Sequence, residues 1–125
     1  MDIDLTSFSA AQQRALFDLL ILAMYADSHM TTFEDQELQE LLAAMGYIEK
    51  LDRQREFDEA VTRLRPSIQT IYTAKEQALA LAQFFTIRNQ QKQVYQAVEQ
   101  MMAADNHVSS WETVLLMELR MKFRL

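Results

Sequence analysis

The stretch "YADSHMTTFE", residues 25–34, recurs near the other end of the chain as "AADNHVSSWE", residues 103–112. Apolar positions on both sides follow the same shift of 78 residues, so that Leu20 matches Val98. The shared polar pairs are Asp27 and Asp105, His29 and His107, and Glu34 and Glu112. This repeat predicts a helix–link–helix hairpin that occurs twice, and we expect the two hairpins to pack around a pseudo-twofold axis with the middle helices covering one side.

The composition favours helices along the whole chain. The chain has 125 residues, half of them hydrophobic, with only one Gly and one Pro. Such a chain has few turn formers and is rich in Met, Leu, Ala, Gln and Glu, which are good helix formers. We therefore expect an all-α fold, a compact bundle of about six or seven helices that forms one domain over residues 1–125.

Capping boxes, in which a hydroxyl residue precedes Glu or Gln by three positions, mark helix starts. They predict starts at Ser9, Thr31, Thr73 and Ser109, and Asn89 is a further candidate cap. The helix that begins at Thr73 is expected to continue through residues 79–85.

Glycine, proline and apolar spacing indicate where the helices end and what they bury. The first helix should run to about Tyr25, and the apolar residues along 16–24 are so broadly spread that burial on most sides is expected. Gly46 is placed to end the second helix, and Pro66 should end a third helix over residues 52–64. Most methionines are expected in the core, with a Met-lined binding groove as the alternative. These are Met24, Met45, Met101, Met102, Met117 and Met121.

Several classes of protein are disfavoured by what the sequence lacks. Without cysteine there is no disulfide or thiolate chemistry. The acidic start has no signal-peptide pattern, and the most apolar run, residues 15–26, is too short to span a membrane and carries Asp18. We expect a cytoplasmic protein that does not span a membrane. The net charge of −6 argues against nucleic acid as a partner, because binding phosphates requires a basic face.

Each copy of the repeated stretch places an aspartate at the C-terminal end of a predicted helix, where the helix dipole disfavours a carboxylate. Two compensations are open: a local turn in which the carboxylate accepts backbone amides, or a bound divalent cation. The glutamates have a plain role in the capping boxes. If a cation binds, its ligands should be Asp27, Glu34, Asp105 and Glu112, with His29 and His107 as weaker candidates.

The pattern Ala-Asp-x-x-apolar-Ser/Thr-x-x-Glu, which joins two helices, resembles the TerB-like family, named for tellurite-resistance proteins and similar to the N-terminal region of DjlA co-chaperones. The resemblance extends from about Phe8 to Phe123, although Ser28 and Asn106 stand where the family usually has Gly. It implies an all-helical, non-enzymatic protein linked to metal or chemical stress, with metal binding through the four acidic residues and association with membrane-bound protein partners.

The leading hypothesis is therefore a non-catalytic helical module that binds a partner, with a divalent cation as its only candidate cofactor. Two alternatives remain open, a metal-dependent hydrolase with a carboxylate site and a purely structural homodimer. The hydrolase is disfavoured because helical di-metal enzymes use Glu-x-x-His pairs, which this sequence lacks. The oligomeric state and the identity of the partner do not follow from the sequence.

Overall fold

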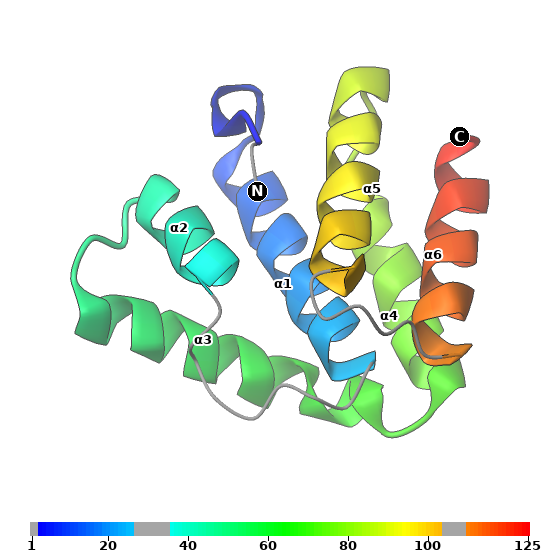
Figure 1. Cartoon of the computed structure of the whole chain (residues 1–125), viewed down its shortest axis with the longest axis horizontal. Helices are drawn as coiled ribbons and strands as arrows, with labels where there is room; N and C mark the ends of the chain where they lie inside the picture. Colours follow the sequence, from blue (N-terminus) through cyan, green and yellow to red (C-terminus); the bar gives the residue numbers. More distant parts are fainter. Residues whose placement is uncertain (1–2, 27–35, 104–109) are drawn as a thin grey trace.

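The computed structural model describes residues 3–26, 36–103 and 110–125, and every regular element in these ranges is helical (Figure 1). The described elements are the 3-10 turn η1 (Leu5–Ser7), α1 (Ala10–Ala26), α2 (Gln36–Ala44), α3 (Lys50–Leu64), the 3-10 turn η2 (Arg65–Ile68), α4 (Ile71–Ala82), α5 (Arg88–Ala103) and α6 (Ser110–Phe123). The predicted all-α fold is confirmed.

Helix α1 forms the centre of the molecule and is contacted by α3, α4, α5 and α6. It begins with the predicted capping box: the Gln12 amide donates to Ser9 Oγ (3.1 Å), and the Ser9 amide donates to Gln12 Oε1 (2.9 Å). Every side chain from residue 15 to residue 23 is buried. The burial on most sides that the broad apolar pattern predicts is confirmed.

Gly46 ends the α2 segment as predicted. Its φ of +110° lies in a region that L side chains rarely adopt, and the Tyr47 amide donates back to the Leu42 carbonyl at 3.0 Å. This reversed turn satisfies a carbonyl that the helix end would leave without a partner.

Helix α3 lies across the lower end of α1 (Figure 1). It starts at Lys50, two residues before the predicted start, and ends at Leu64, just before Pro66. Its buried side chains recur every three or four residues, as an amphipathic helix requires. They are Phe57, Ala60, Val61 and Leu64.

The predicted start of α4 is wrong. Thr73 is the third residue of the helix, and Thr70 is its cap: the Thr73 amide donates to Thr70 Oγ1 (3.1 Å) and the Thr70 amide donates to Thr73 Oγ1 (3.2 Å). Two threonines thus form a reciprocal box one turn earlier than the Thr-x-x-Glu pattern indicated. The helix also ends at Ala82, so Phe84 and Phe85 lie in the link to α5.

The predicted cap of α5 is wrong as well. The helix begins at Arg88, and the Gln91 amide donates to the Ile87 carbonyl (3.0 Å), so Asn89 lies inside the first turn. Helix α5 runs beside α1 in the same direction, whereas α4 and α6 run the opposite way (Figure 1).

Four of the six methionines predicted in the core lie in it or pack against it. Met117 and Met121 of α6 do not, because they are 57% and 69% exposed. They lie on the side of α6 away from its buried residues Leu115 and Leu119. The prediction of core methionines is wrong for these two.

Candidate functional site

The predicted cation ligands fall mostly outside the described residues. This applies to Asp27, Glu34 and Asp105 and to the weaker candidates His29 and His107. Glu112, which is described, lies in the first turn of α6 and is fully buried. Within residues 3–26, 36–103 and 110–125, no group of three or more acidic or histidine side chains is placed to hold a metal ion. The cation site stays a prediction.

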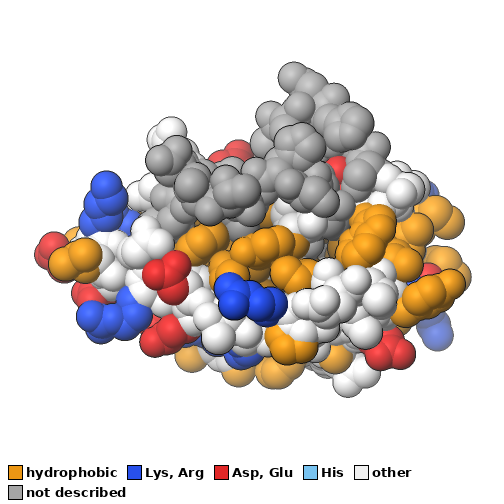
Figure 2. Space-filling model, turned by 90° about the horizontal axis from the view of Figure 1, so that it is seen from below, with side chains coloured by type: hydrophobic (Ala, Val, Ile, Leu, Met, Phe, Trp, Pro, Cys, Tyr) orange, Lys and Arg blue, Asp and Glu red, His pale blue; other side chains and the backbone are white. Residues whose placement is uncertain are grey.

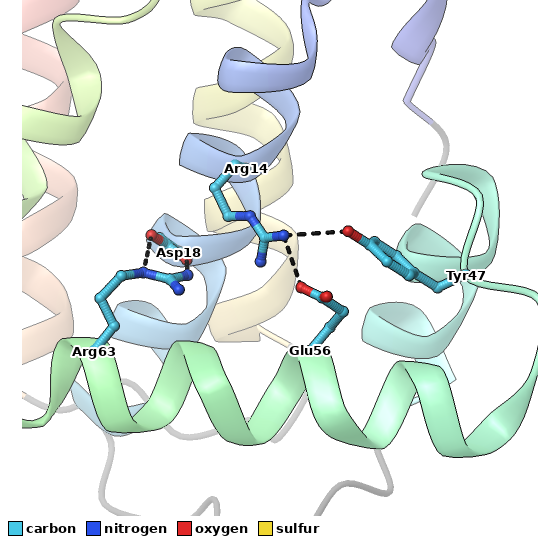
Figure 3. Close-up of polar contacts among 5 residues, drawn as sticks. All are labelled: Arg14, Asp18, Tyr47, Glu56 and Arg63. Atoms are coloured by element: carbon cyan, nitrogen blue, oxygen red, sulfur yellow. Dashed lines mark hydrogen bonds and ion pairs between the residues drawn. The ribbon is translucent and has the colours of Figure 1, made fainter.

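A cluster of charged side chains joins α1 to α3 (Figure 3). Asp18 lies within the apolar run of α1 and is only 5% exposed. Arg63 of α3 binds it through both carboxylate oxygens, with Nη2 at 2.6 Å from Oδ1 and Nε at 3.3 Å from Oδ2. A bidentate pair of this kind fixes the relative position of the two helices as well as contributing electrostatic energy.

A second ion pair lies one turn earlier in α1. Arg14 Nη2 is 2.7 Å from Glu56 Oε2 of α3 and donates to the Tyr47 hydroxyl at 3.2 Å (Figure 3). Because Tyr47 directly follows the turn at Gly46, this contact also ties the end of α2 to α1. The two ion pairs together attach the α2–α3 part of the chain to the central helix.

The electrostatics of the cluster are set by burial. Burial raises the pKa of Asp18 above its ordinary value, although Arg63 and Arg14 act in the opposite direction. Burial also lowers the pKa of Arg14, but Glu56, Tyr47 and Asp18 together raise it, so this guanidinium remains charged. Since both oxygens of Asp18 are bound to Arg63, the cluster is arranged to hold α3 against α1.

A network of side-chain amides lies at the start of α1. Gln90 is buried and donates to the Ser7 carbonyl (2.6 Å) and to Gln12 Oε1 (3.2 Å). Gln12 donates in turn to the Phe84 carbonyl (2.8 Å) and to Gln90 Oε1 (3.1 Å). The two amides therefore join the starts of α1 and α5 to the segments that precede them.

The residues beside these glutamines repeat the same arrangement. Gln13 donates to the Phe8 carbonyl (3.3 Å), and Gln91 donates to the Phe85 carbonyl (2.9 Å). The rings of Phe8 and Phe85 pack against each other with centroids 5.8 Å apart. These residues were not predicted from the sequence; their signal is a Phe followed four or five residues later by Gln-Gln and a basic residue, present at residues 8–14 and again at residues 85–92.

The outer side of α4 and α6 carries exposed apolar side chains. Lys75 and Glu118 bridge the two helices with 3.8 Å between Nζ and Oε1. Tyr72 lies one turn before Lys75, Met121 lies one turn after Glu118, and Met117 lies one turn before Met121 on the same face of α6. Tyr72 is 71% exposed. We call Tyr72, Met117 and Met121 the α4–α6 stripe.

Hydrophobic side chains also reach the surface in the space-filling view (Figure 2). Figure 2 shows hydrophobic side chains gathered at its right-hand edge, on the side of α4 and α6. A monomeric protein seldom exposes several large apolar side chains together unless they form a contact surface. The α4–α6 stripe is therefore the candidate binding surface.

Neither a membrane-spanning helix in the described residues nor a similar known protein is found. Within the described part of the chain, no helix combines the length and the apolar character needed to cross a bilayer. The chain matches no protein-family model, no curated protein and no solved structure.

Proposed function

We propose that this protein is a non-catalytic helical module that binds another protein through the α4–α6 stripe. The observation that carries the proposal is the exposure of Tyr72 on α4 and of Met117 and Met121 on α6, two helices that pack together and are bridged by Lys75 and Glu118. Methionine side chains are flexible and polarizable, so they adapt to apolar surfaces of different shape. The sequence left a Met-lined binding groove as an alternative to core methionines. Protein binding through such a Met-lined surface is the function that the geometry supports best.

The partner should present an amphipathic helix. The stripe follows two packed helices, and an amphipathic helix can lay apolar residues at spacings of three and four along such a face. The Lys75–Glu118 pair provides polar groups of both signs beside the apolar side chains. A polar rim around an apolar centre is the usual composition of a protein–protein interface.

The proposed module has two hairpins related by a pseudo-twofold axis. The support is that two equivalent residues meet, because Gln12 contacts Gln90 at the repeat spacing of 78; the nearby contact between Phe8 and Phe85 is one residue out of this register. Residues on a twofold axis contact their own equivalents, as in a symmetric dimer. The TerB-like assignment, the cytoplasmic location, the role in metal or chemical stress and the cation at the acidic links remain proposals from the sequence.

Photo-crosslinking in the cells that make the protein would test partner binding. A photoreactive amino acid at Met117 should crosslink to a defined protein, and one at Gln96, an exposed position on α5, should not. The captured protein would then be purified and its Kd measured against the wild type. Met117→Glu/Met121→Glu should weaken binding at least tenfold, and Gln96→Glu/Gln100→Glu should leave it unchanged. Equal binding of both variants by every crosslinked protein would contradict the proposal.

Sedimentation equilibrium would separate this function from the structural homodimer. The proposed module should sediment as one chain at micromolar concentration. A dimer that dissociates in Met117→Glu/Met121→Glu would show instead that a second copy covers the stripe.

A further inference from the structure

Positive charge is concentrated in two segments of this acidic chain. Residues 83–93 and 119–125 hold five of the 12 Lys and Arg residues and none of the 18 Asp and Glu residues. The five are Arg88, Lys92, Arg120, Lys122 and Arg124. We call these two segments the basic end. The remainder of the chain is correspondingly more negative than the net charge of −6 suggests.

The two segments meet in space at the upper end of Figure 1. Arg88 donates from Nη1 to the Phe123 carbonyl (2.6 Å) and from Nη2 to the Arg124 carbonyl (3.0 Å). An open groove of about 460 Å³ lies between them, lined mainly by polar and cationic side chains. These are Gln83, Thr86, Arg88, Gln91, Lys122 and Arg124.

Three of the five cations of the basic end have no hydrogen-bond or ion-pair partner in the described part of the chain, whereas Arg120 Nε donates to the main-chain oxygen of Leu125 at 3.0 Å. Among the described residues, the side chains of Lys92, Lys122 and Arg124 make no hydrogen bond or ion pair, and all three residues are exposed. The nearby acidic residue Asp4, whose amide donates to Gln93, uses its carboxylate to accept from the Thr6 amide and hydroxyl. The groove therefore offers free positive charge to an anionic group.

Two exposed apolar side chains accompany these cations. Phe84 and Ile87, in the link between α4 and α5, are 46% and 59% exposed. Apolar side chains beside Lys and Arg are typical of surfaces that lie at the headgroup level of an anionic membrane. The lining of the groove is too polar to receive apolar side chains of a peptide, but it suits phosphate groups.

We propose that the basic end binds the surface of an anionic phospholipid bilayer. Lipid phosphates lie in the groove against Lys122 and Arg124, and Phe84 and Ile87 enter the boundary between headgroups and acyl chains. The acidic remainder of the protein is repelled by the same surface, which orients the molecule with its basic end toward the lipid. The groove residues Lys122 and Arg124 are not part of the α4–α6 stripe, but Met121 of the stripe lies next to Lys122.

Co-sedimentation of the purified full chain with lipid vesicles tests the proposal. Vesicles of phosphatidylcholine mixed with the anionic lipid phosphatidylglycerol should bind the protein, and pure phosphatidylcholine should not. Lys122→Glu/Arg124→Glu should lower the partition coefficient at least tenfold. The matched control Lys50→Glu/Arg55→Glu changes the net charge equally on exposed residues of α3, and it should have a much smaller effect.

The apolar contribution is tested without changing any charge. Ile87→Ser and Phe84→Ser should each lower the partition coefficient, while thermal unfolding shows that each variant remains folded. Because Ile87 is the more exposed of the two, it provides the readout if Phe84→Ser fails to fold.

Four outcomes would overturn the proposal. If both charge-reversed variants lost vesicle binding to the same extent, net charge alone would explain the binding. If the wild type bound neutral vesicles equally well, recognition of anionic lipid would be excluded. Binding of inorganic phosphate or a short oligonucleotide, lost in Lys122→Glu/Arg124→Glu but without vesicle binding, would assign the groove to a soluble anion or nucleic acid. Self-association that the same variant abolishes, again without vesicle binding, would assign it to a second copy of this chain.

Discussion

Gln12 and Gln90, 78 residues apart in the chain, exchange hydrogen bonds between their side-chain amides, with each Nε2 donating to the other Oε1 at 3.1 and 3.2 Å. Each amide also donates to a backbone carbonyl, that of Phe84 for Gln12 and that of Ser7 for Gln90. Gln90 is buried, so its amide depends on these partners in place of water. The pair links the first turns of α1 and α5 directly.

Gln90→Ala should therefore destabilise the protein. A net contribution of about 0.5–1.5 kcal/mol for each hydrogen bond and the unpaired groups left behind predict a loss of about 1–3 kcal/mol. Urea unfolding would measure it, with the exposed Gln96→Ala on the same helix as the control, expected within about 0.5 kcal/mol of the wild type. A double-mutant cycle with Gln12→Ala should give a coupling of at least about 0.5 kcal/mol. Additive effects would show that the two amides act independently.

Arg63→Met should cost more than the loss of an ordinary surface ion pair, because it leaves the Asp18 carboxylate buried without its main partner. Breaking a fully buried pair costs about 3–5 kcal/mol. The Arg63 side chain is 43% exposed, so we expect a smaller loss, about 2 kcal/mol. The control is Arg55→Met, which breaks an exposed pair with Asp52 and should cost less than about 1 kcal/mol. Equal losses in denaturant unfolding would mean that the buried pair contributes no more than the exposed one.

Stability should depend on pH through Asp18 in a defined direction. Burial raises the pKa of this carboxyl in the folded state, so the folded protein holds its proton more tightly than the unfolded chain does. The group therefore favours folding most below its ordinary pKa, and this contribution is lost as pH rises to the raised folded value. Asp18→Asn cannot titrate and should lack this component. Unfolding midpoints of both proteins between pH 3 and pH 7 would measure it, and a difference that does not vary with pH would contradict the prediction.

Substituting Gly46 tests whether backbone conformation alone selects glycine at the end of α2. A Cβ at this position would meet no atom within 4 Å, so no steric clash is expected. Because φ is +110°, Gly46→Ala should cost about 1–2 kcal/mol through strain alone. D-alanine introduced by chemical ligation adopts positive φ without strain and should preserve stability. Equal melting temperatures for the L- and D-alanine proteins would contradict this explanation.

A cation at the repeated acidic links should be visible as thermal stabilisation. A ligand at a hundred times its Kd adds about 2.7 kcal/mol to the free energy of unfolding. Chelator-treated protein would be melted with Ca²⁺, Mg²⁺, Mn²⁺ and Zn²⁺, beside the variant Asp27→Ala/Asp105→Ala. A shift that the variant loses would establish the site. If no ion shifted the melting temperature, the repeated stretch would be only a duplicated link between helices.

The local features that the sequence predicts well are those encoded by neighbouring residues. The capping box at Ser9, the buried α1 and the turn at Gly46 each depend on a few consecutive side chains and their spacing. The start of α4 was predicted wrongly because the competing Thr70–Thr73 box has the same kind of local energy as the expected one.

Features that depend on packing could not be predicted in this way. Asp18 stood out as a charge within an apolar run, but nothing in the sequence identified Arg63, 45 residues later, as its partner. The exposure of Met117 and Met121 likewise depends on which side of α6 faces α4 and α5, which amino-acid composition does not decide.

The first turn of α5 has a consequence for how the molecule opens. Helix ends usually fray, so their amides exchange with solvent through small local openings. Here opening the turn would have to release the Ser7 carbonyl from Gln90 and the carbonyls of Phe123 and Arg124 from Arg88, which lie close to the two ends of the chain. This helix end should therefore exchange its amide hydrogens only together with the rest of the bundle, because its side chains hold both the segment before α1 and the end of α6.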